Sequence, residues 1–210
     1  MKTEQTDFWT SSFGSEYSER NKMDVAEHDD WYVNEFGVSR TEMNRIFLSE
    51  LEVNRVLEVG CNVGNQLRCL QSMGFPQLYG IELQQYAVER AKELTKGMNI
   101  IQGSAFDIPY KDGYFDIVFT SGVLIHISPD DISLAMDEMY RVSGKYIWGF
   151  EYHNAEYVEI DYRGNKDKLW KGDFKQLFLD RFPNLKLVKA ESYKYSQSEN
   201  RDEMYLLEKV

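Results

Sequence analysis

Short apolar runs alternate with amphipathic stretches through the middle of the chain. Five runs have the length and composition of buried strands, at residues 55–60, 76–83, 98–102, 114–120 and 145–150. The stretches that separate several of them repeat apolar residues at helical spacing, over 65–73, 85–96 and 129–141. Strands that alternate with helices in this way predict a parallel sheet covered by helices on both faces.

The flanking segments complete this picture. Residues 41–51 and 174–182 have helical spacing, and residues 185–195 and 204–209 are predicted to be two strands joined by a polar loop. A closing antiparallel hairpin is the simplest account of that pair. Residues 1–40 are polar and aromatic, which leaves two interpretations, a mobile arm or a cap over a site. We expect a doubly wound, Rossmann-like α/β domain of about seven strands over residues 41–210, with an N-terminal helical cap over residues 1–40.

Composition narrows the classes of partner. The 210 residues carry a formal net charge of -11 and contain no block of Lys and Arg. Because nucleic acids and anionic membrane surfaces bind mainly through cationic groups, neither is an expected partner. Two cysteines without metal-type spacing predict neither a disulfide framework nor a metal site, and a polar start without an apolar segment favours a cytoplasmic protein. A small molecule is therefore the expected ligand.

The turn after the first predicted strand carries the strongest chemical signal. Glycines here let the backbone turn sharply and let a ligand approach the main chain, beside the free N–H groups of the next helix. A dinucleotide enzyme would need G-x-G-x-x-G, but Asn62 stands in place of the middle glycine. The segment instead resembles the E-x-G-x-x-x-G pattern of class I methyltransferases, with Glu58, Gly60 and Gly64. This resemblance implies S-adenosylmethionine as the cofactor.

Three later segments add to this resemblance. Glu82 ends the second predicted strand, where a carboxylate can accept hydrogen bonds from a ribose diol. In this class an aspartate after the third strand usually binds adenine, but here Ser104 takes that place, so contacts are expected from Ser104 and the backbone near Ala105. The strand at 115–120 and the loop that follows it resemble the segment beside the methionine end of the cofactor, where Gly122 lets the main chain pass close to the sulfonium. The full predicted set is Trp9, Tyr17, Arg20, Glu58, Gly60, Asn62, Gly64, Asn65, Glu82, Leu83, Ser104, Ala105, Ser121 and Gly122.

Nearly the whole chain is also similar to the pseudaminic acid biosynthesis-associated methylases. The shared motifs are Phe8-Trp9, Phe13-Gly14, Tyr17, Arg20-Asn21, residues 57–64, residues 121–130, Glu151-Tyr152, Tyr162-Arg163-Gly164, Asp167-Lys168-Leu169, Lys171, Asp173-Phe174 and residues 206–209. The resemblance implies a sugar or sugar-nucleotide acceptor. The chain departs from that family at His153, where a second tyrosine is usual, and at Gly172, where an arginine is usual. Because both positions lie near the expected acceptor site, the acceptor of this chain can differ from that of the family.

Methyl transfer needs alignment of the acceptor, exclusion of water and, for an alcohol, removal of a proton. The candidate bases are His126, Glu151 and His153, which follow the fourth and fifth predicted strands. Backbone hydrogen bonding and ordinary solvation at a strand end are the alternatives for these side chains. Tyr152, Arg163 and Lys171 are candidates for acceptor binding, although the two cations would equally form surface ion pairs.

The expected activity is methyl transfer to a small polar metabolite, such as a sugar acid or sugar nucleotide. The same cofactor motifs would also serve an enzyme that cyclises S-adenosylmethionine or transfers another group. A non-catalytic cofactor-binding module and a dehydrogenase are further alternatives; the intact set of Glu58, Gly60, Gly64 and Glu82 argues against the first, and Asn62 argues against the second.

Overall fold

The computed structural model describes residues 1–210 and contains one seven-stranded sheet. The strand order is β3-β2-β1-β4-β5-β9-β8, in which β1 to β5 are parallel and β9 and β8 are antiparallel to their neighbours. The bounds are β1 Arg55–Val59, β2 Gln77–Glu82, β3 Asn99–Gln102, β4 Phe115–Ser121, β5 Ser143–Tyr152, β8 Leu185–Lys194 and β9 Arg201–Lys209. The predicted Rossmann-like sheet with a C-terminal antiparallel hairpin is confirmed.

Helices cover both faces of this sheet, and each face has its own hydrophobic core. One core lies beneath α4 (Arg40–Leu48), α5 (Asn65–Ser72) and α6 (Gln85–Leu94), and the other beneath α7 (Ile132–Val142) and α8 (Phe174–Arg181). Side chains alternate between the two cores along each central strand; Val56 packs on the first core and Leu57 on the second. None of the helices combines the length and the apolar character that a membrane span requires.

Every helix and strand predicted between residues 41 and 210 is present, and no end differs by more than three residues. The short 3-10 helix η1 (Leu124–His126) and one small sheet were not predicted. A two-stranded sheet pairs β6 (Val158–Glu159) with β7 (Trp170–Lys171). Strands of two residues carry no periodic pattern, so sequence reasoning had no signal for them.

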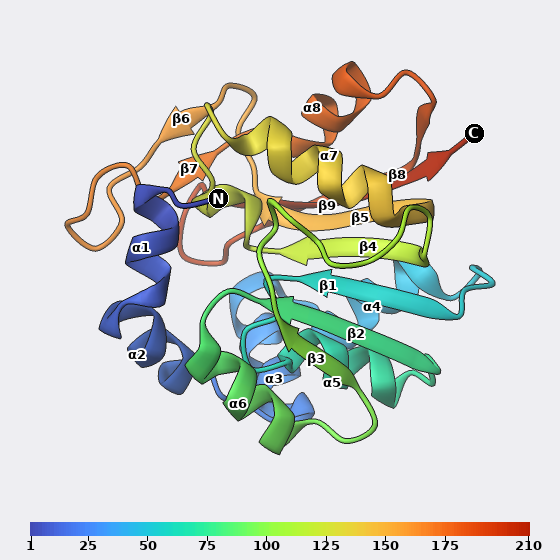
Figure 1. Cartoon of the computed structure of the whole chain (residues 1–210), viewed down its shortest axis with the longest axis horizontal. Coiled ribbons are helices and arrows are strands. Elements are labelled where there is room, and N and C mark those ends of the chain that lie inside the picture. Colours follow the sequence, from blue (N-terminus) through green and yellow to red (C-terminus); the bar gives the residue numbers. More distant parts are fainter.

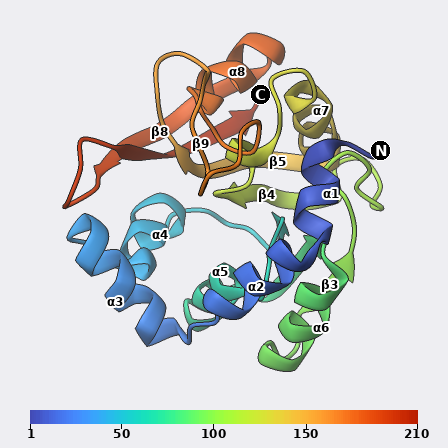
Figure 2. The same ribbon diagram turned by 90° about the vertical axis from the view of Figure 1, so that its left-hand side faces the viewer.

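The first 40 residues contain three helices, α1 (Glu4–Thr10), α2 (Ser12–Arg20) and α3 (Val25–Phe36). Two of these helices begin with a capping box, at Thr3 and at Asp24. In each box the side chain of the N-cap residue and that of the residue three positions later accept hydrogen bonds from each other's backbone N–H groups. The helices lie across the carboxyl ends of the parallel strands, which point toward α1 and α2 (Figure 1). Viewed onto that end, α1, α2 and α3 surround the strand ends (Figure 2). Of the two interpretations of this segment, the structure supports the cap.

Candidate cofactor and acceptor site

A cavity of about 470 Å³ lies between the cap and the carboxyl ends of the strands. It runs past the loops that follow β3, β2, β1 and β4, and ends at β5 and the start of β9. Most of the residues predicted from the sequence line it: Trp9, Tyr17, Glu58, Gly60, Asn62, Asn65, Glu82, Leu83, Ser104, Ala105, Ser121, Gly122, His126 and Tyr152. The fold therefore brings together side chains and glycines from six strand ends and from the cap.

The glycine-bearing turn after β1 depends on left-handed backbone. Gly60 has φ +74°, and a Cβ added there would lie 2.7 Å from Cγ2 of Val123. Gly64 has φ +81° and starts α5, although it does not itself line the cavity. Only glycine adopts these conformations without strain, which is why the turn can pass so close to the neighbouring loop. Asn65 and Gln66, the first residues of α5, line the cavity, so the start of this helix with its unpaired N–H groups borders it.

Glu82 is held at the end of β2 by two backbone N–H groups. Its Oε2 accepts a hydrogen bond from the Asn62 amide at 2.9 Å, and its Oε1 accepts one from the Gln84 amide at 2.8 Å. Burial raises the pKa of this carboxyl above its usual range, while the bonds from Gln84 and Asn62 act in the opposite direction. The carboxylate is thus fixed before any ligand binds, with lone pairs left for the hydroxyls of a ribose.

The loop after β3 is stabilised by the side chain of Ser104. The hydroxyl of Ser104 accepts a hydrogen bond from the Phe106 amide at 3.2 Å and so stabilises the turn. Ala105 and Phe106 line the cavity, whereas Asp107 does not. This geometry agrees with the expectation that backbone near Ala105, rather than an acidic side chain, faces an adenine.

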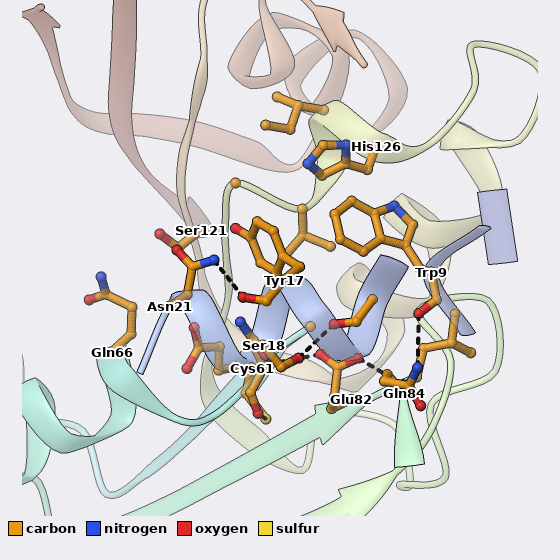
Figure 3. A pocket seen from close by; sticks show the side chains of 18 of the residues that line it. Trp9, Tyr17, Ser18, Asn21, Cys61, Gln66, Glu82, Gln84, Ser121 and His126 are labelled. Atoms are coloured by element: carbon orange, nitrogen blue, oxygen red, sulfur yellow. Dashed lines mark hydrogen bonds between the residues drawn. The ribbon is translucent and has the colours of Figure 1, made fainter. Parts of the chain in front are cut away.

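The cap is fastened to the same region through Gln84. Its amide nitrogen donates to the carbonyls of Ser11 and Trp9, at 3.1 and 3.4 Å. Figure 3 shows Glu82 and Gln84 next to each other, with Gln84 bonded to the backbone of Trp9. Tyr17 lines the cavity beside the Trp9 ring, with ring centroids 5.2 Å apart. Arg20, also predicted as a cofactor contact, does not line this cavity, and its guanidinium lies 3.7 Å from the carboxylate of Glu16.

His126 is enclosed by the cap. Its Nδ1 lies 2.7 Å from the Lys168 carbonyl, and its ring lies 4.6 Å from that of Trp9. Burial lowers the pKa of His126 to about 4, which keeps the imidazole neutral. A neutral ring that donates from Nδ1 to Lys168 retains a lone pair on Nε2, so His126 stays a candidate base.

The neutral state of His126 predicts a pH dependence of stability. The unfolded state takes up a proton below about pH 6.5, whereas the folded ring stays neutral until about pH 4, so stability falls as the pH drops between these values. Between pH 7.5 and pH 5 the wild type should lose about 2 kcal/mol more than His126→Gln. Urea unfolding of both proteins at the two pH values measures this difference. His28, whose pKa burial also lowers to about 4, is present in both proteins and cancels. An equal loss in both would mean that His126 is protonated in the fold.

Neither of the other two candidate bases, Glu151 and His153, lines the cavity. Glu151 is buried beneath the loop after β4, where it accepts hydrogen bonds from the amides of Val123 and Ile125 at 3.2 and 3.4 Å. It positions that loop. His153 lies beside Glu203 and Asp173, and the ammonium of Lys175 forms ion pairs with these two carboxylates at 3.0 and 3.4 Å.

Of the three predicted acceptor contacts, only Tyr152 lines the cavity. Arg163 lies in the loop between β6 and β7, with φ +54°, and is exposed. The ammonium of Lys171 lies 4.0 Å from the centre of the Tyr152 ring and donates to the side chain of Asn200. Both cations therefore stay outside the space in which an acceptor would bind.

Sequence reasoning missed the far end of the cavity. Its residues come from α3, α5, the end of β5 and the C-terminal hairpin: His28, Trp31, Tyr32, Gln66, Phe150, Tyr195 and Asp202. These positions belong to segments that are adjacent only after the sheet and the hairpin have formed. The one sequence signal was the density of aromatic and acidic residues in the first 40 positions.

Residues 57–146 match the family described as "Methyltransferase domain". The match extends from β1 to the first residues of β5. This match, together with the fold, supports the predicted enzyme class and S-adenosylmethionine as its cofactor. The matched residues include the turn after β1 and the loops after β2, β3 and β4, but neither the cap nor the end of β5.

The relatives share this central part. Cycloartenol-C-24-methyltransferase 1 from Oryza sativa subsp. japonica is 28% identical over 94 residues, which cover 42% of this chain and 27% of the relative. The chloroplastic tocopherol O-methyltransferase from Arabidopsis thaliana is 29% identical over 100 residues, which cover 45% and 28%. The chain thus matches little more than a quarter of the length of these two relatives.

The fold similarity extends further. The crystal structure of a SAM-dependent methyltransferase from Leishmania major superimposes with a TM-score of 0.73 at 16% identity, over 98% of this chain and 87% of that protein. At this identity the likeness supports the fold, including the cap and the C-terminal hairpin, rather than a particular reaction.

Proposed function

We propose that this chain transfers the methyl group of S-adenosylmethionine to a small polar acceptor that binds at the β5 and β9 end of the cavity. The observation that carries the proposal is the continuous cavity, which begins at a fixed carboxylate on β2 and ends beyond β4 among side chains that the cofactor motifs do not use. A ligand whose ribose lies at Glu82 and whose methionine part lies near Gly60 and Ser121 leaves that end free for a second molecule.

The residues present fit the adenosyl cofactor. The side-chain oxygen of Asn62 and the indole nitrogen of Trp9 are buried and have no hydrogen-bond partner within the chain, and both residues line the cavity. Buried polar atoms are normally paired, so these two atoms are available for a ligand. Glu82 would hold the ribose, the turn at Gly60 would leave room for the main part of the cofactor, and Trp9 and Tyr17 would exclude water. The bound cofactor supplies a methyl carbon activated by a positive sulfur.

The similarity to pseudaminic acid biosynthesis-associated methylases supports a sugar or sugar-derived acceptor. A phosphate or carboxylate on that acceptor is disfavoured, because Arg163 and Lys171 do not reach the cavity. We therefore favour a small acceptor that presents hydroxyl or amino groups to the β5 and β9 end of the cavity, which we call the acceptor chamber.

Incubation of the purified protein with S-adenosylmethionine tests the proposal. Methyl transfer predicts S-adenosylhomocysteine that accumulates only after an acceptor is added, together with an acceptor that gains one methyl group by mass. Formation of 5′-methylthioadenosine from the cofactor alone would indicate cyclisation instead, and failure to bind either S-adenosylmethionine or S-adenosylhomocysteine in calorimetry would refute the proposal.

A further inference from the structure

Asp202 is a buried carboxylate at the far end of the cavity. Its side chain lines the cavity although the residue is only 7% exposed. Oδ2 accepts a hydrogen bond from the Tyr195 hydroxyl at 3.1 Å, which orients the carboxylate, but Oδ1 has no partner within the chain. A buried carboxylate oxygen without a partner loses its hydration without compensation. Oδ1 of Asp202 is therefore free to accept a hydrogen bond from a donor on a ligand.

The position of Asp202 separates it from the cofactor residues. It lies on β9, directly opposite Tyr152 on β5, whereas the ribose carboxylate Glu82 lies on β2. In the sheet order β2-β1-β4-β5-β9, three strands lie between β2 and β9. Neighbouring strands are about 4.8 Å apart, so the two carboxylates belong to opposite ends of the cavity. Asp202 consequently faces the acceptor.

The walls of the cavity contain no Lys or Arg. They do contain three carboxylates, Glu58, Glu82 and Asp202. Arg40 and Lys171 favour the charged form of Asp202, yet neither forms an ion pair with it within 4 Å. Arg40 instead donates to Tyr32, Asn44 and Ser121, and Lys171 donates to Asn200. Asp202 thus has no ion-pair partner, although the buried guanidinium of Arg40 lies 5.2 and 4.5 Å from the centres of the Tyr32 and Phe150 rings.

Aromatic rings complete the chamber. Tyr152 and Tyr195 lie with their centroids 5.8 Å apart, and Tyr32 and Phe150 are at the same separation. The Tyr152 ring already carries the ammonium of Lys171. Aromatic faces attract cations, most strongly when these are removed from water. A carboxylate beside several rings is the combination that recognises an ammonium group.

We propose that the acceptor is an amine, and that Asp202 binds its nitrogen. This inference rests on the proposed methyl transfer and names the class of acceptor. Asp202 would receive a proton from the ammonium form, which leaves a neutral amine. The nitrogen lone pair then forms a bond to the methyl carbon as the carbon–sulfur bond breaks, and the bond electrons stay on sulfur. The products are a methylated ammonium group, S-adenosylhomocysteine and protonated Asp202, which releases its proton to solvent. Burial raises the pKa of Asp202 to about 7, which suits a group that both gains and loses a proton near neutral pH.

Methylammonium is a suitable probe because it carries the proposed group and little else. Thermal unfolding is compared in methylammonium chloride and in sodium chloride of equal ionic strength, at pH 8, with and without S-adenosylhomocysteine. We expect methylammonium to raise the Tm of the wild type by about 2 to 4 °C. The rise should be absent in Asp202→Asn, which keeps the shape of the side chain and removes its charge. Glu199→Gln is the matched control, since this side chain lies on the same hairpin and is 92% exposed.

The outcomes separate the two proposals. No shift in the wild type, or an equal shift in Asp202→Asn, overturns the amine inference. If the wild type does not bind S-adenosylhomocysteine in calorimetry, the proposed function fails, whatever methylammonium does. A third measurement compares methyl transfer to glucosamine, tyramine and their matched alcohols, glucose and tyrosol. Methylation of an alcohol without methylation of its amine would also overturn the inference, whereas a preference for the amine that Asp202→Asn reduces more than tenfold would support it.

Discussion

Glu82→Ala should weaken the binding of S-adenosylhomocysteine by about 1–3 kcal/mol, or roughly 5- to 150-fold in Kd. The reason is that the carboxylate, which we propose as the acceptor for the ribose diol, is already held in place by the amides of Asn62 and Gln84. Its removal leaves both the ribose hydroxyls and these two amides without their partner. Isothermal titration of the wild type and the variant measures the difference.

Two further variants make this test specific. Glu82→Gln keeps one oxygen and the shape of the side chain, so its loss of affinity should be smaller than that of the alanine variant. Glu89→Ala removes a carboxylate from an exposed position on α6, where it contacts only Gln85, and should leave the affinity unchanged. Wild-type affinity in Glu82→Ala, with the fold intact by circular dichroism, would remove Glu82 from the site.

The second large effect is expected from a single added methyl group in the cap. Gly14 lies where α2 passes the end of α1, and a Cβ at this position would lie only 1.9 Å from the Trp9 carbonyl oxygen. Because that contact is with backbone, α1 must move as a unit. Gly14→Ala should therefore displace Trp9 from the cavity and disturb the hydrogen bonds that Gln84 makes to the cap. We expect a loss of at least tenfold in cofactor affinity, or about 1.4 kcal/mol.

Limited proteolysis accompanies the affinity measurement, since a displaced cap exposes the first 21 residues to cleavage. The control is Gly37→Ala, at the C-terminus of α3. A Cβ at Gly37 has open space around it, and the residue adds only the strain of φ +76°. It should reduce stability slightly and leave both cofactor affinity and cleavage of α1 unchanged. If Gly14→Ala binds the cofactor like the wild type, the cap is not required for binding.

The fold and the cofactor half of the site could be predicted because their signals are local. Gly60, Gly64 and Glu82 lie at strand ends that the hydrophobic pattern marks, and chain order alone fixes which strand carries each of them. These few positions are enough to predict a tight turn after β1 and a carboxylate for a ribose at the end of β2. The sequence therefore predicted both the sheet and the end of the sheet at which the cavity lies.

The acceptor half could not be predicted in the same way. Asp202 and Tyr152 are 50 positions apart and meet only because β9 inserts between β5 and β8 in a particular register. A shift of one residue would turn Asp202 to the opposite face of the sheet. Charge also misled the prediction: Arg163 and Lys171 stand in a motif shared with the similar family, but they lie outside the cavity. Their neighbours in space, rather than in sequence, determine what they bind.

The attachment of the cap to Gln84 links the release of the nucleoside product to the movement of α1 and α2. Glu82, the proposed ribose carboxylate, and Gln84, which fastens α1 and α2, lie two residues apart. On the proposed function we expect release of the spent nucleoside to require movement of these helices, so that each catalytic cycle breaks and remakes the hydrogen bonds of Gln84 to the cap. In steady-state kinetics, the departure of S-adenosylhomocysteine would then set the turnover number, and a burst of methylated product in the first cycle would reveal it.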